Sequence, residues 1–157
     1  MSAAGDDAAP LGPLAPSLTR GVGRALRDAG YVSLSEFTLR SRRRVDLIAL
    51  NRRGSIAIVE IKSSIEDFRA DHKWRDYLAY CDRFYFAVPD DFPRQALPED
   101  CGIWVADGYG ATLRREAPLQ ALNATRRRTQ ILRFAQTAAQ RLTRLADPGP
   151  GRGRFSR

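Results

Sequence analysis

The chain has 157 residues, of which 43% are hydrophobic, and this size and apolar content suit a single domain with its own core. No apolar run approaches the roughly 18 residues that a membrane-spanning helix needs, and the N-terminus shows no signal peptide. The two cysteines, Cys81 and Cys101, are too few for a disulfide framework and lack the spacing of metal ligands. We therefore expect a cytoplasmic protein with both cysteines in its core.

The formal net charge is +8, which makes a nucleic acid, with its phosphate backbone, the natural partner. An anionic membrane surface is an alternative, and a role in solubility alone would also account for the charge. Nearly all of the 26 basic residues are arginines, and the only lysines are Lys62 and Lys73. Arginine does not replace a compact ammonium whose pKa can shift, so these two lysines draw attention to the segment around them.

The chain begins with a segment rich in Ala, Asp, Gly and Pro, residues 1–15, which we predict to be disordered. A single domain is expected over residues 16–146. It starts with a helix over residues 17–29, for which Ser17 is a suitable N-cap. A strand is predicted over residues 31–39, and a turn rich in arginine follows it.

Two strands joined by a tight turn come next in the chain. Residues 45–50 and 56–62 are apolar runs rich in β-branched residues, and the sequence between them is typical of a hairpin turn. A three-residue loop with Gly54 in the left-handed conformation would pair Asn51 with Ser55. This loop fixes the register of the whole hairpin.

The same register places Asp46 beside Glu60, and Lys62 lies on the same face because side chains alternate along a strand. An ionised carboxylate in an apolar strand is costly unless a partner compensates it. Two neighbouring acids beside an ammonium could bind a hard divalent cation and a phosphate. The alternative is an ordinary ion pair between one acid and Lys62 at the end of a strand.

The rest of the chain predicts both helices and strands. Ser63 or Ser64 can cap a helix that runs to about residue 80 and bends or breaks near Asp71, because its apolar residues do not fall on one stripe. Further elements are predicted as strands over residues 82–88, 103–106 and 111–115, the last at an edge, and a helix over residues 123–146. The basic tail, residues 147–157, is predicted to be disordered.

A three-strand meander, followed by a crossover helix and another strand, predicts an α/β fold with a mixed sheet flanked by helices. Periodicity alone permits other α/β folds. The final helix carries a broad apolar face made of Ile131, Leu132, Ala135, Ala138, Ala139, Leu142 and Leu145.

Asp46 and the string Glu60-Ile61-Lys62 resemble the signature of the PD-(D/E)XK nuclease superfamily. Over roughly residues 17–146 the chain is similar, more closely, to the MmcB-like DNA repair proteins of bacteria. This likeness rests on Ser33-Leu34-Ser35-Glu36-Phe37, Arg43-Arg44-Val45-Asp46, Val59-Glu60-Ile61-Lys62-Ser63-Ser64, Asp67-Phe68-Arg69-Ala70-Asp71, Lys73-Trp74 and Phe84-Tyr85-Phe86-Ala87-Val88. The resemblance implies a restriction-endonuclease-like α/β fold: a mixed β-sheet flanked by helices (αβββαβ core) with a C-terminal helix.

The resemblance also implies a metal site. Asp46 and Glu60 would bind Mg²⁺ or Mn²⁺, with the backbone carbonyl of Ile61 as a further ligand. Glu36 is a candidate third acid, because a short turn between the strands would set it beside Asp46. Lys62 would orient or deprotonate the attacking water, or stabilise charge developing on the phosphate.

Other residues are candidate contacts to DNA. Lys73 and Tyr77 lie four residues apart, on one face of the predicted helix, and resemble a Gln-x-x-x-Tyr element of RecB-like nucleases with Lys in place of Gln. Trp74 is expected in the core and His72 at a solvated position. Two arginine clusters could contact phosphates or be solvated charge runs; they are Arg42, Arg43 and Arg44, and Arg126, Arg127 and Arg128.

These features predict a DNA repair protein with a metal-dependent nuclease fold that hydrolyses DNA phosphodiester bonds, a Mg²⁺-dependent deoxyribonuclease of the bacterial cytoplasm acting at the nucleoid. A DNA-binding or recruiting repair factor with weak or no cleavage is the alternative, and RNA processing is a third possibility. The expected partners are DNA and other repair proteins, and no membrane.

Overall fold

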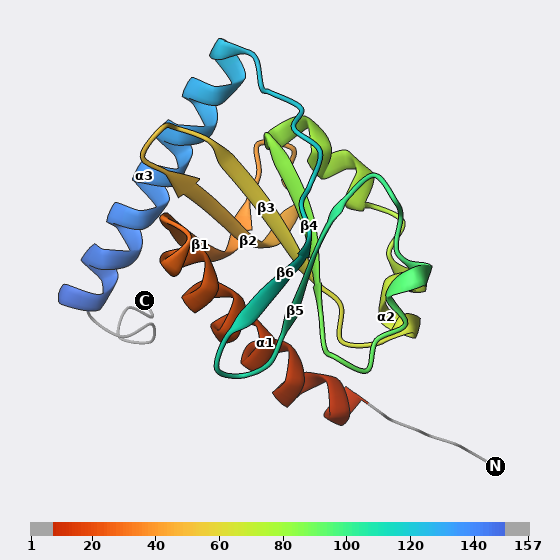
Figure 1. Ribbon diagram of the computed structural model, residues 1–157. Helices are drawn as coiled ribbons and strands as arrows, with labels where there is room; N and C mark the ends of the chain where they lie inside the picture. The colour runs from red at the N-terminus through yellow and green to blue at the C-terminus, as the bar shows by residue number, and fades with distance from the viewer. Residues whose placement is uncertain (1–7, 150–157) are drawn as a thin grey trace.

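The computed structural model describes residues 8–149, which form one mixed β-sheet of six strands with helices packed against it (Figure 1). The strands lie side by side in chain order: β1 (Tyr31–Thr38), β2 (Arg44–Asn51), β3 (Ile56–Ile61), β4 (Arg83–Val88), β5 (Gly102–Ala106) and β6 (Ala111–Arg115). The helices are α1 (Ala8–Asp28), α2 (Ile65–Ala70) and α3 (Ala124–Ala146), with 3₁₀ segments η1 (Trp74–Tyr80) and η2 (Arg94–Ala96).

The first three strands form an antiparallel meander, and α2 and η1 make the crossover to β4, which is parallel to β3. β5 is parallel to β4, and β6 pairs antiparallel with β5. This order of elements and the mixed sheet confirm the predicted α/β fold with its C-terminal helix. In the described part of the chain, no helix combines the length and the apolar character needed to cross a bilayer.

Apolar side chains pack on both faces of the sheet. On one face, α1 contributes Leu18, Val22 and Leu26, which lie against small and branched residues of the central strands. On the other face, η1 and α3 cover an aromatic layer in which Trp74 stacks on Phe84 with ring centroids 5.4 Å apart. Trp74 and both cysteines are buried, and the cysteines are free, as the sequence predicted.

The first helix is longer than predicted. It begins at Ala8 rather than at Ser17, so residues 8–15, which were expected to be disordered, are helical. Ala15 lies one turn before Leu18 and packs in the same apolar layer. The composition of this segment predicted disorder; from Ala15 onward, packing against the sheet stabilises the helix beyond what propensity alone would give.

The predicted break in the next helical region is confirmed. The Ser64 hydroxyl caps α2 by accepting a hydrogen bond from Asp67 N at 3.1 Å. The helix ends at Ala70, and Asp71 is in an extended conformation. The segment after the break is a 3₁₀ helix, not a continuation of the α-helix. The remaining segments predicted to be disordered, residues 1–7 and 150–157, lie outside the described residues.

Both hairpins of the meander use the same kind of loop. Asn51 N donates to Ser55 O at 3.1 Å, and Gly54 is left-handed at φ +82°. The β1–β2 loop has the equivalent closing bond, and there Arg42 takes the left-handed conformation at φ +74°. The predicted register of β2 against β3 is therefore confirmed.

We expect these two loop positions to respond oppositely to substitution. Gly54→Ala should lower the free energy of unfolding by about 1 kcal/mol, because a side chain is strained at this φ. The added Cβ itself meets only ordinary contacts, the nearest with Ile131 Cδ1 at 3.7 Å. Arg42→Gly should raise the free energy of unfolding by about 0.5 kcal/mol, since glycine relieves strain but gains entropy in the unfolded chain. Urea unfolding measures both, and effects of the same sign would contradict this loop geometry.

Asp82 ties α3 to the sheet just before β4. Its buried carboxylate accepts two hydrogen bonds from the guanidinium of Arg127 in α3, at 2.6 and 2.7 Å. It also accepts from Ile56 N at 2.8 Å and from Leu122 N at 2.9 Å. Burial alone would raise the pKa of Asp82, but the bonds from Arg127 and the two backbone amides lower it below its ordinary value.

Asp82→Asn should lower the free energy of unfolding at neutral pH by about 3–5 kcal/mol, because it leaves the guanidinium of Arg127 without its buried partner. The matched control is Asp100→Asn, which removes an exposed ion pair with Arg75 at 3.3 Å and should cost less than about 1 kcal/mol. Denaturant titration distinguishes the two. Similar small losses in both variants would mean that Asp82 does not anchor α3.

Candidate active site

The strands β2 and β3 separate beyond the pair Leu47–Val59, and two acidic side chains bridge them there. Glu60 Oε1 accepts a hydrogen bond from Asp46 N at 2.9 Å, and Asp46 Oδ2 accepts a hydrogen bond from Ile61 N at 2.8 Å. Each carboxylate is thus held by the backbone of the opposite strand, and the two lie beside each other as the register requires. Asp46 Oδ1 and Glu60 Oε2 take no part in these bonds.

These acids open into a cleft of about 660 Å³ between α1, the ends of β1 to β3 and the start of α2. Glu60 is only 5% exposed, so it forms part of the floor of this cleft. The cleft is lined by Ala15, Pro16, Thr19, Arg20, Ser35, Glu36, Asp46, Glu60, Ile61, Lys62, Ser63 and Asp67. Because α1 starts well before Ser17, it supplies the opposite wall.

Both acids bind protons more tightly than usual. Burial raises the pKa of Glu60 to about 8, and the neighbouring Asp46 carboxylate adds to this effect. Burial also raises the pKa of Asp46. The ammonium of Lys62 and the two backbone amides act in the opposite direction on both groups, but do not cancel burial. Without a bound cation the pair therefore retains a proton near neutral pH.

Lys62 forms a buried ion pair with Asp71, in which Lys62 Nζ lies 2.7 Å from Asp71 Oδ2. Burial would raise the pKa of Asp71, but the bonds from Lys62 and from Lys73 N lower it below its ordinary value. The ion-pair alternative for Lys62 is thus realised, with a different acid from the two considered. From the sequence, Asp71 was considered only as the point where the helix breaks. Its position at this break, nine residues after Lys62, was the signal that could have suggested an ion pair between the two.

Glu36 lies on β1 opposite Asp46, because its neighbours pair as Ser35–Leu47 and Phe37–Val45. It lines the cleft and is exposed, and its φ of +48° is left-handed, a strained conformation in the middle of a strand. The predicted placement beside Asp46 is therefore found. Over residues 8–149, however, no group of three or more acidic, histidine or cysteine side chains is gathered closely enough to hold a metal ion.

Lys73 and Tyr77 do not share a face, contrary to expectation, because their segment is a 3₁₀ helix with three residues per turn. Lys73 is exposed, as is His72, whereas Tyr77 is buried in the aromatic layer. Burial, together with the carboxylates of Glu60 and Asp71, raises the pKa of Tyr77 to about 12. The phenol is thus buried in the core and not at the surface where DNA would pass.

The two arginine clusters differ in how free their side chains are. Arg42 and Arg44 are exposed on the β1–β2 hairpin, and Arg43 pairs with Asp76 at 2.9 Å. In the second cluster, Arg128 is exposed, while Arg126 donates to Ala79 O at 3.0 Å.

The expectation that Arg127 is a surface contact is corrected. Its guanidinium is bound to the buried carboxylate of Asp82, and Nη1 also donates to Gly54 O at 2.8 Å. These bonds make Arg127 a structural link between α3 and the sheet.

The donor set at the acid pair suits a hard divalent cation. Two carboxylates and a backbone carbonyl are the oxygen ligands that such an ion prefers. Mg²⁺ is commonly held by one or two carboxylates with water completing its shell, so it does not need a third acid.

The fold and the site define an α/β domain with an acid pair, buried Glu60 and half-buried Asp46, at the strand ends beside a cleft. The sequence profile of the MmcB-like family, described as DNA repair protein MmcB-like, matches residues 11–149. The chain therefore belongs to the MmcB-like DNA repair protein family, as the resemblance predicted.

A solved structure is also similar, that of the SPO1766 protein of unknown function from Silicibacter pomeroyi. It is 45% identical, with a TM-score of 0.82, and the match covers 88% of this chain and 96% of that one. No curated protein matches the chain.

The raised pKa of Glu60 predicts an unusual dependence of stability on pH. With a chelator present, the free energy of unfolding should fall as the pH rises from about 5 to about 8, because folded Glu60 keeps a proton that the unfolded chain has released near pH 4.5. The slope from this group is at most about 1.4 kcal/mol per pH unit. Glu60→Gln should make the slope much shallower, with Asp46 accounting for the remainder, and it should be more stable than the wild type at pH 8, since its amide oxygen can still accept a hydrogen bond from Asp46 N.

The control for this measurement is Glu66→Gln, on the exposed side of α2, which should keep the wild-type slope. Denaturant unfolding over this pH range gives the comparison. A Glu60→Gln protein with the wild-type slope would show that the buried carboxyl titrates normally.

Proposed function

We propose that this protein is a metal-dependent nuclease of the PD-(D/E)XK type that hydrolyses phosphodiester bonds of DNA during repair. The observation that carries the proposal is the pair of adjacent carboxylates that lines the cleft, buried Glu60 and half-buried Asp46, with Lys62 two residues after Glu60. Burying two like charges costs several kcal/mol, a cost that packing of β2 against β3 does not require. Membership of a DNA repair family supports DNA as the substrate.

A Mg²⁺ or Mn²⁺ ion would be held by the carboxylates of Asp46 and Glu60 and the carbonyl of Ile61. When bound, such an ion lowers the pKa of a water molecule and neutralises charge on the phosphate. The chain's own part is to orient the ligands: the bonds from Asp46 N and Ile61 N fix both carboxylates.

Lys62 would stabilise negative charge that develops on the phosphate. Of its three possible roles this fits best, because an ammonium bonded to Asp71 at 2.7 Å is poorly placed to take a proton from water. Asp71 is then a positioning residue, which sets where the ammonium lies. The exposed side chains of Arg20, Arg42 and Arg44 are suited to contact the DNA backbone on either side of the cleft.

A second candidate is a DNA-binding or recruiting repair factor that keeps this fold without robust cleavage. It is favoured by one observation: Lys62 is committed to an ion pair with Asp71. On this alternative the cleft binds DNA or a cation, and chemistry is weak or absent.

The proposal predicts cleavage that depends on the acid pair. With Mg²⁺ or Mn²⁺, the full chain should cut one or more of single-stranded, nicked, flapped and duplex DNA. Asp46→Asn, Glu60→Gln and Lys62→Met should each lower the rate about 10²–10³-fold, because each removes a group that acts on the transition state. Asp71→Asn should cause a smaller loss in kcat with little change in KM, since it acts through Lys62. The control Glu66→Gln should cleave normally.

Metal binding can be measured separately from DNA cleavage, through its effect on thermal stability. Mn²⁺ should raise the thermal unfolding temperature of the wild type and of Lys62→Met, but not of Asp46→Asn, because only a protein that binds the ion is stabilised by it. Cleavage that survives Asp46→Asn would refute the site. DNA binding and Mn²⁺ stabilisation without cleavage of any substrate would favour the recruiting factor.

A further inference from the structure

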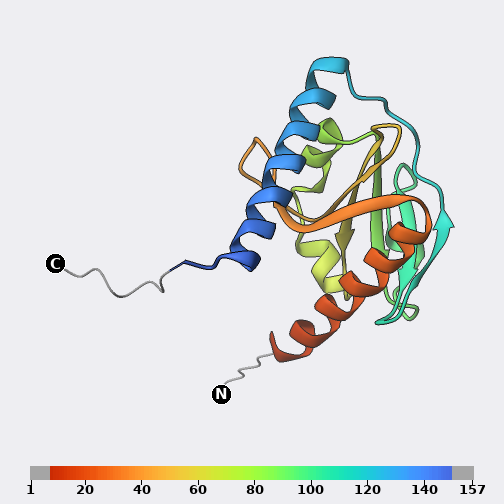
Figure 2. The same ribbon diagram turned by 90° about the vertical axis from the view of Figure 1, so that its left-hand side faces the viewer.

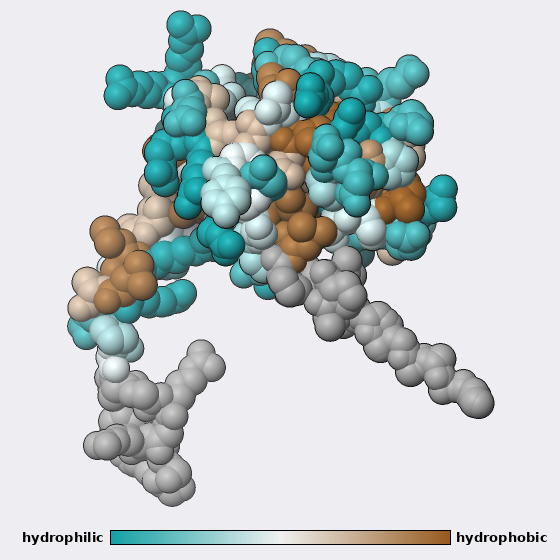
Figure 3. Space-filling model, turned by 60° about the horizontal axis from the view of Figure 1, so that its bottom comes forward, coloured by the Kyte–Doolittle hydropathy of each residue, from teal (hydrophilic) through white to brown (hydrophobic). Residues whose placement is uncertain are grey.

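The last helix, α3, turns its apolar face away from the rest of the molecule. Its buried residues are Gln130 and Phe134, whereas Leu132, Leu142 and Leu145 are 51%, 67% and 83% exposed. Most of the apolar face predicted for this helix is therefore not packed on the sheet; Ile131, which lies against the core, is the exception. Both ribbon views show the C-terminal turns of α3 leaving the edge of the sheet (Figures 1 and 2), and the space-filling view shows apolar surface on this projecting end (Figure 3).

The arginines of α3 explain this orientation. Arg127 binds Asp82, Arg133 donates to Thr38 O at 3.1 Å, and Arg141 donates to Glu36 O at 2.9 Å. These side chains point toward the body of the domain and hold that side of the helix against it. As a result, these three positive charges do not lie on the outward face of α3.

The outward residues form a stripe with the spacing of a coiled coil. The α3 stripe consists of Arg128, Leu132, Ala135, Ala139, Leu142 and Ala146, all of them exposed and separated alternately by four and three residues. This spacing is the a/d pattern of a heptad repeat, which a partner helix covers. One flank of the stripe is polar but uncharged, with Gln136, Gln140 and Thr143.

The stripe is also symmetric about its own centre. If a second α3 runs antiparallel with Ala135 opposite Ala139, the same register places Leu132 opposite Leu142. A closed two-fold dimer requires a surface that complements itself in this way. We infer that the α3 stripe is a homodimer interface, in which the α3 helices of two copies of this chain pack antiparallel.

A hollow at one end of the stripe and the small residues at its centre support a second copy as the occupant. A hollow of about 340 Å³ beside the start of α3 is lined by Ala124, Arg127, Arg128, Ile131 and Leu132. In the antiparallel register, Leu145 of the second copy, among the most exposed apolar side chains, lies over this hollow. The small alanines at the centre allow the two helix backbones to approach closely.

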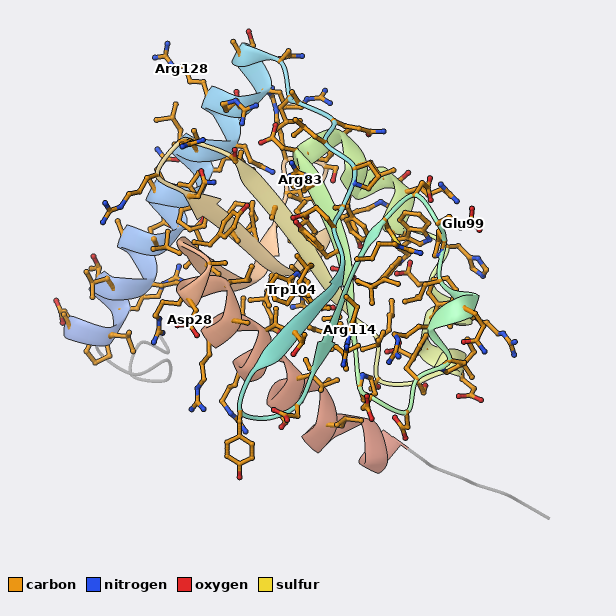
Figure 4. The ribbon with its side chains drawn as sticks, viewed as in Figure 1. Asp28, Arg83, Glu99, Trp104, Arg114 and Arg128 are labelled. Atoms are coloured by element: carbon orange, nitrogen blue, oxygen red, sulfur yellow. The ribbon has the colours of Figure 1, made fainter. Side chains whose placement is uncertain are left out.

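Charge is complementary in the same register. Arg128 points outward at the N-terminal end of α3 (Figure 4), and exposed Asp147 caps the other end. The pairing sets Arg128 of one copy beside Asp147 and the helix C-terminus of the second copy, where a cation is favoured. A lipid surface fits less well, because a helix lying on a membrane presents its basic residues on the polar face, and here most of them bond to the protein.

The oligomeric state of the full chain tests this inference. Sedimentation or light scattering from about 1 to 100 μM should show a monomer–dimer equilibrium in the wild type. Leu142→Arg should be monomeric throughout this range, because it buries a charge against Leu132 of the second copy. The matched control is Leu119→Arg, which alters an exposed leucine outside α3 and should dimerise normally. A monomeric wild type, or a Leu142→Arg protein that still dimerises, would overturn the inference.

A charge exchange tests the antiparallel register independently of any apolar change. Arg128→Glu and Asp147→Arg should each weaken dimerisation by about threefold to tenfold, and the double variant should recover most of the loss, since the pair is restored with its charges reversed. Circular dichroism should be unchanged in all three, because these residues are exposed at the two ends of α3. Additive losses in the double variant would exclude this arrangement of the two helices.

Discussion

Two carboxylates, one buried and one half-buried, lie side by side where β2 and β3 separate, and the rest of the site depends on how they are held there. Asp46 and Glu60 each take a backbone N–H of the opposite strand, so neither can swing into solvent to avoid the other. Their mutual repulsion is reduced only by a proton, by the ammonium of Lys62, or by a cation. The long α1 walls the cleft on one side, and the crossover through α2 brings Asp71 to Lys62 on the other.

The acid pair could be predicted because it depends on local rules. Strand periodicity and a single glycine, Gly54, determine the loop, and the loop determines which residues face each other. The same logic, applied across the first hairpin, placed Glu36 opposite Asp46. Asp71 could not be found in this way, because its contact with Lys62 depends on where α2 breaks and how the following segment packs. The long α1 was missed for a related reason: tertiary packing outweighed a composition that favours disorder.

The arginines show why composition alone did not identify the functional surface. Nearly every basic residue of this chain is an arginine, yet the arginines have different uses. Arg127 pairs with the buried carboxylate of Asp82, and Arg133 and Arg141 bind backbone carbonyls and so hold α3 against the domain. Arg42 and Arg44 are exposed charges. Sequence position does not distinguish these uses, since they depend on which carboxylate or carbonyl lies opposite after folding. The orientation of α3 could not be read from its apolar face for the same reason: hydrogen bonds from Arg127, Arg133 and Arg141 hold the other side of the helix against the domain.

The net charge of the residues that line the cleft is opposite in sign to that of the whole protein. The chain carries a net +8, which attracts a polyanion, yet the cleft is lined by four carboxylates, Glu36, Asp46, Glu60 and Asp67, and only two bases, Arg20 and Lys62. A DNA strand drawn to the basic surface would thus be repelled at the point where it meets the acids. Bound divalent cations would reverse the local sign, so they would admit the phosphate as well as satisfy the buried pair. A cation requirement would therefore appear in the binding of DNA within the cleft and not only in its cleavage.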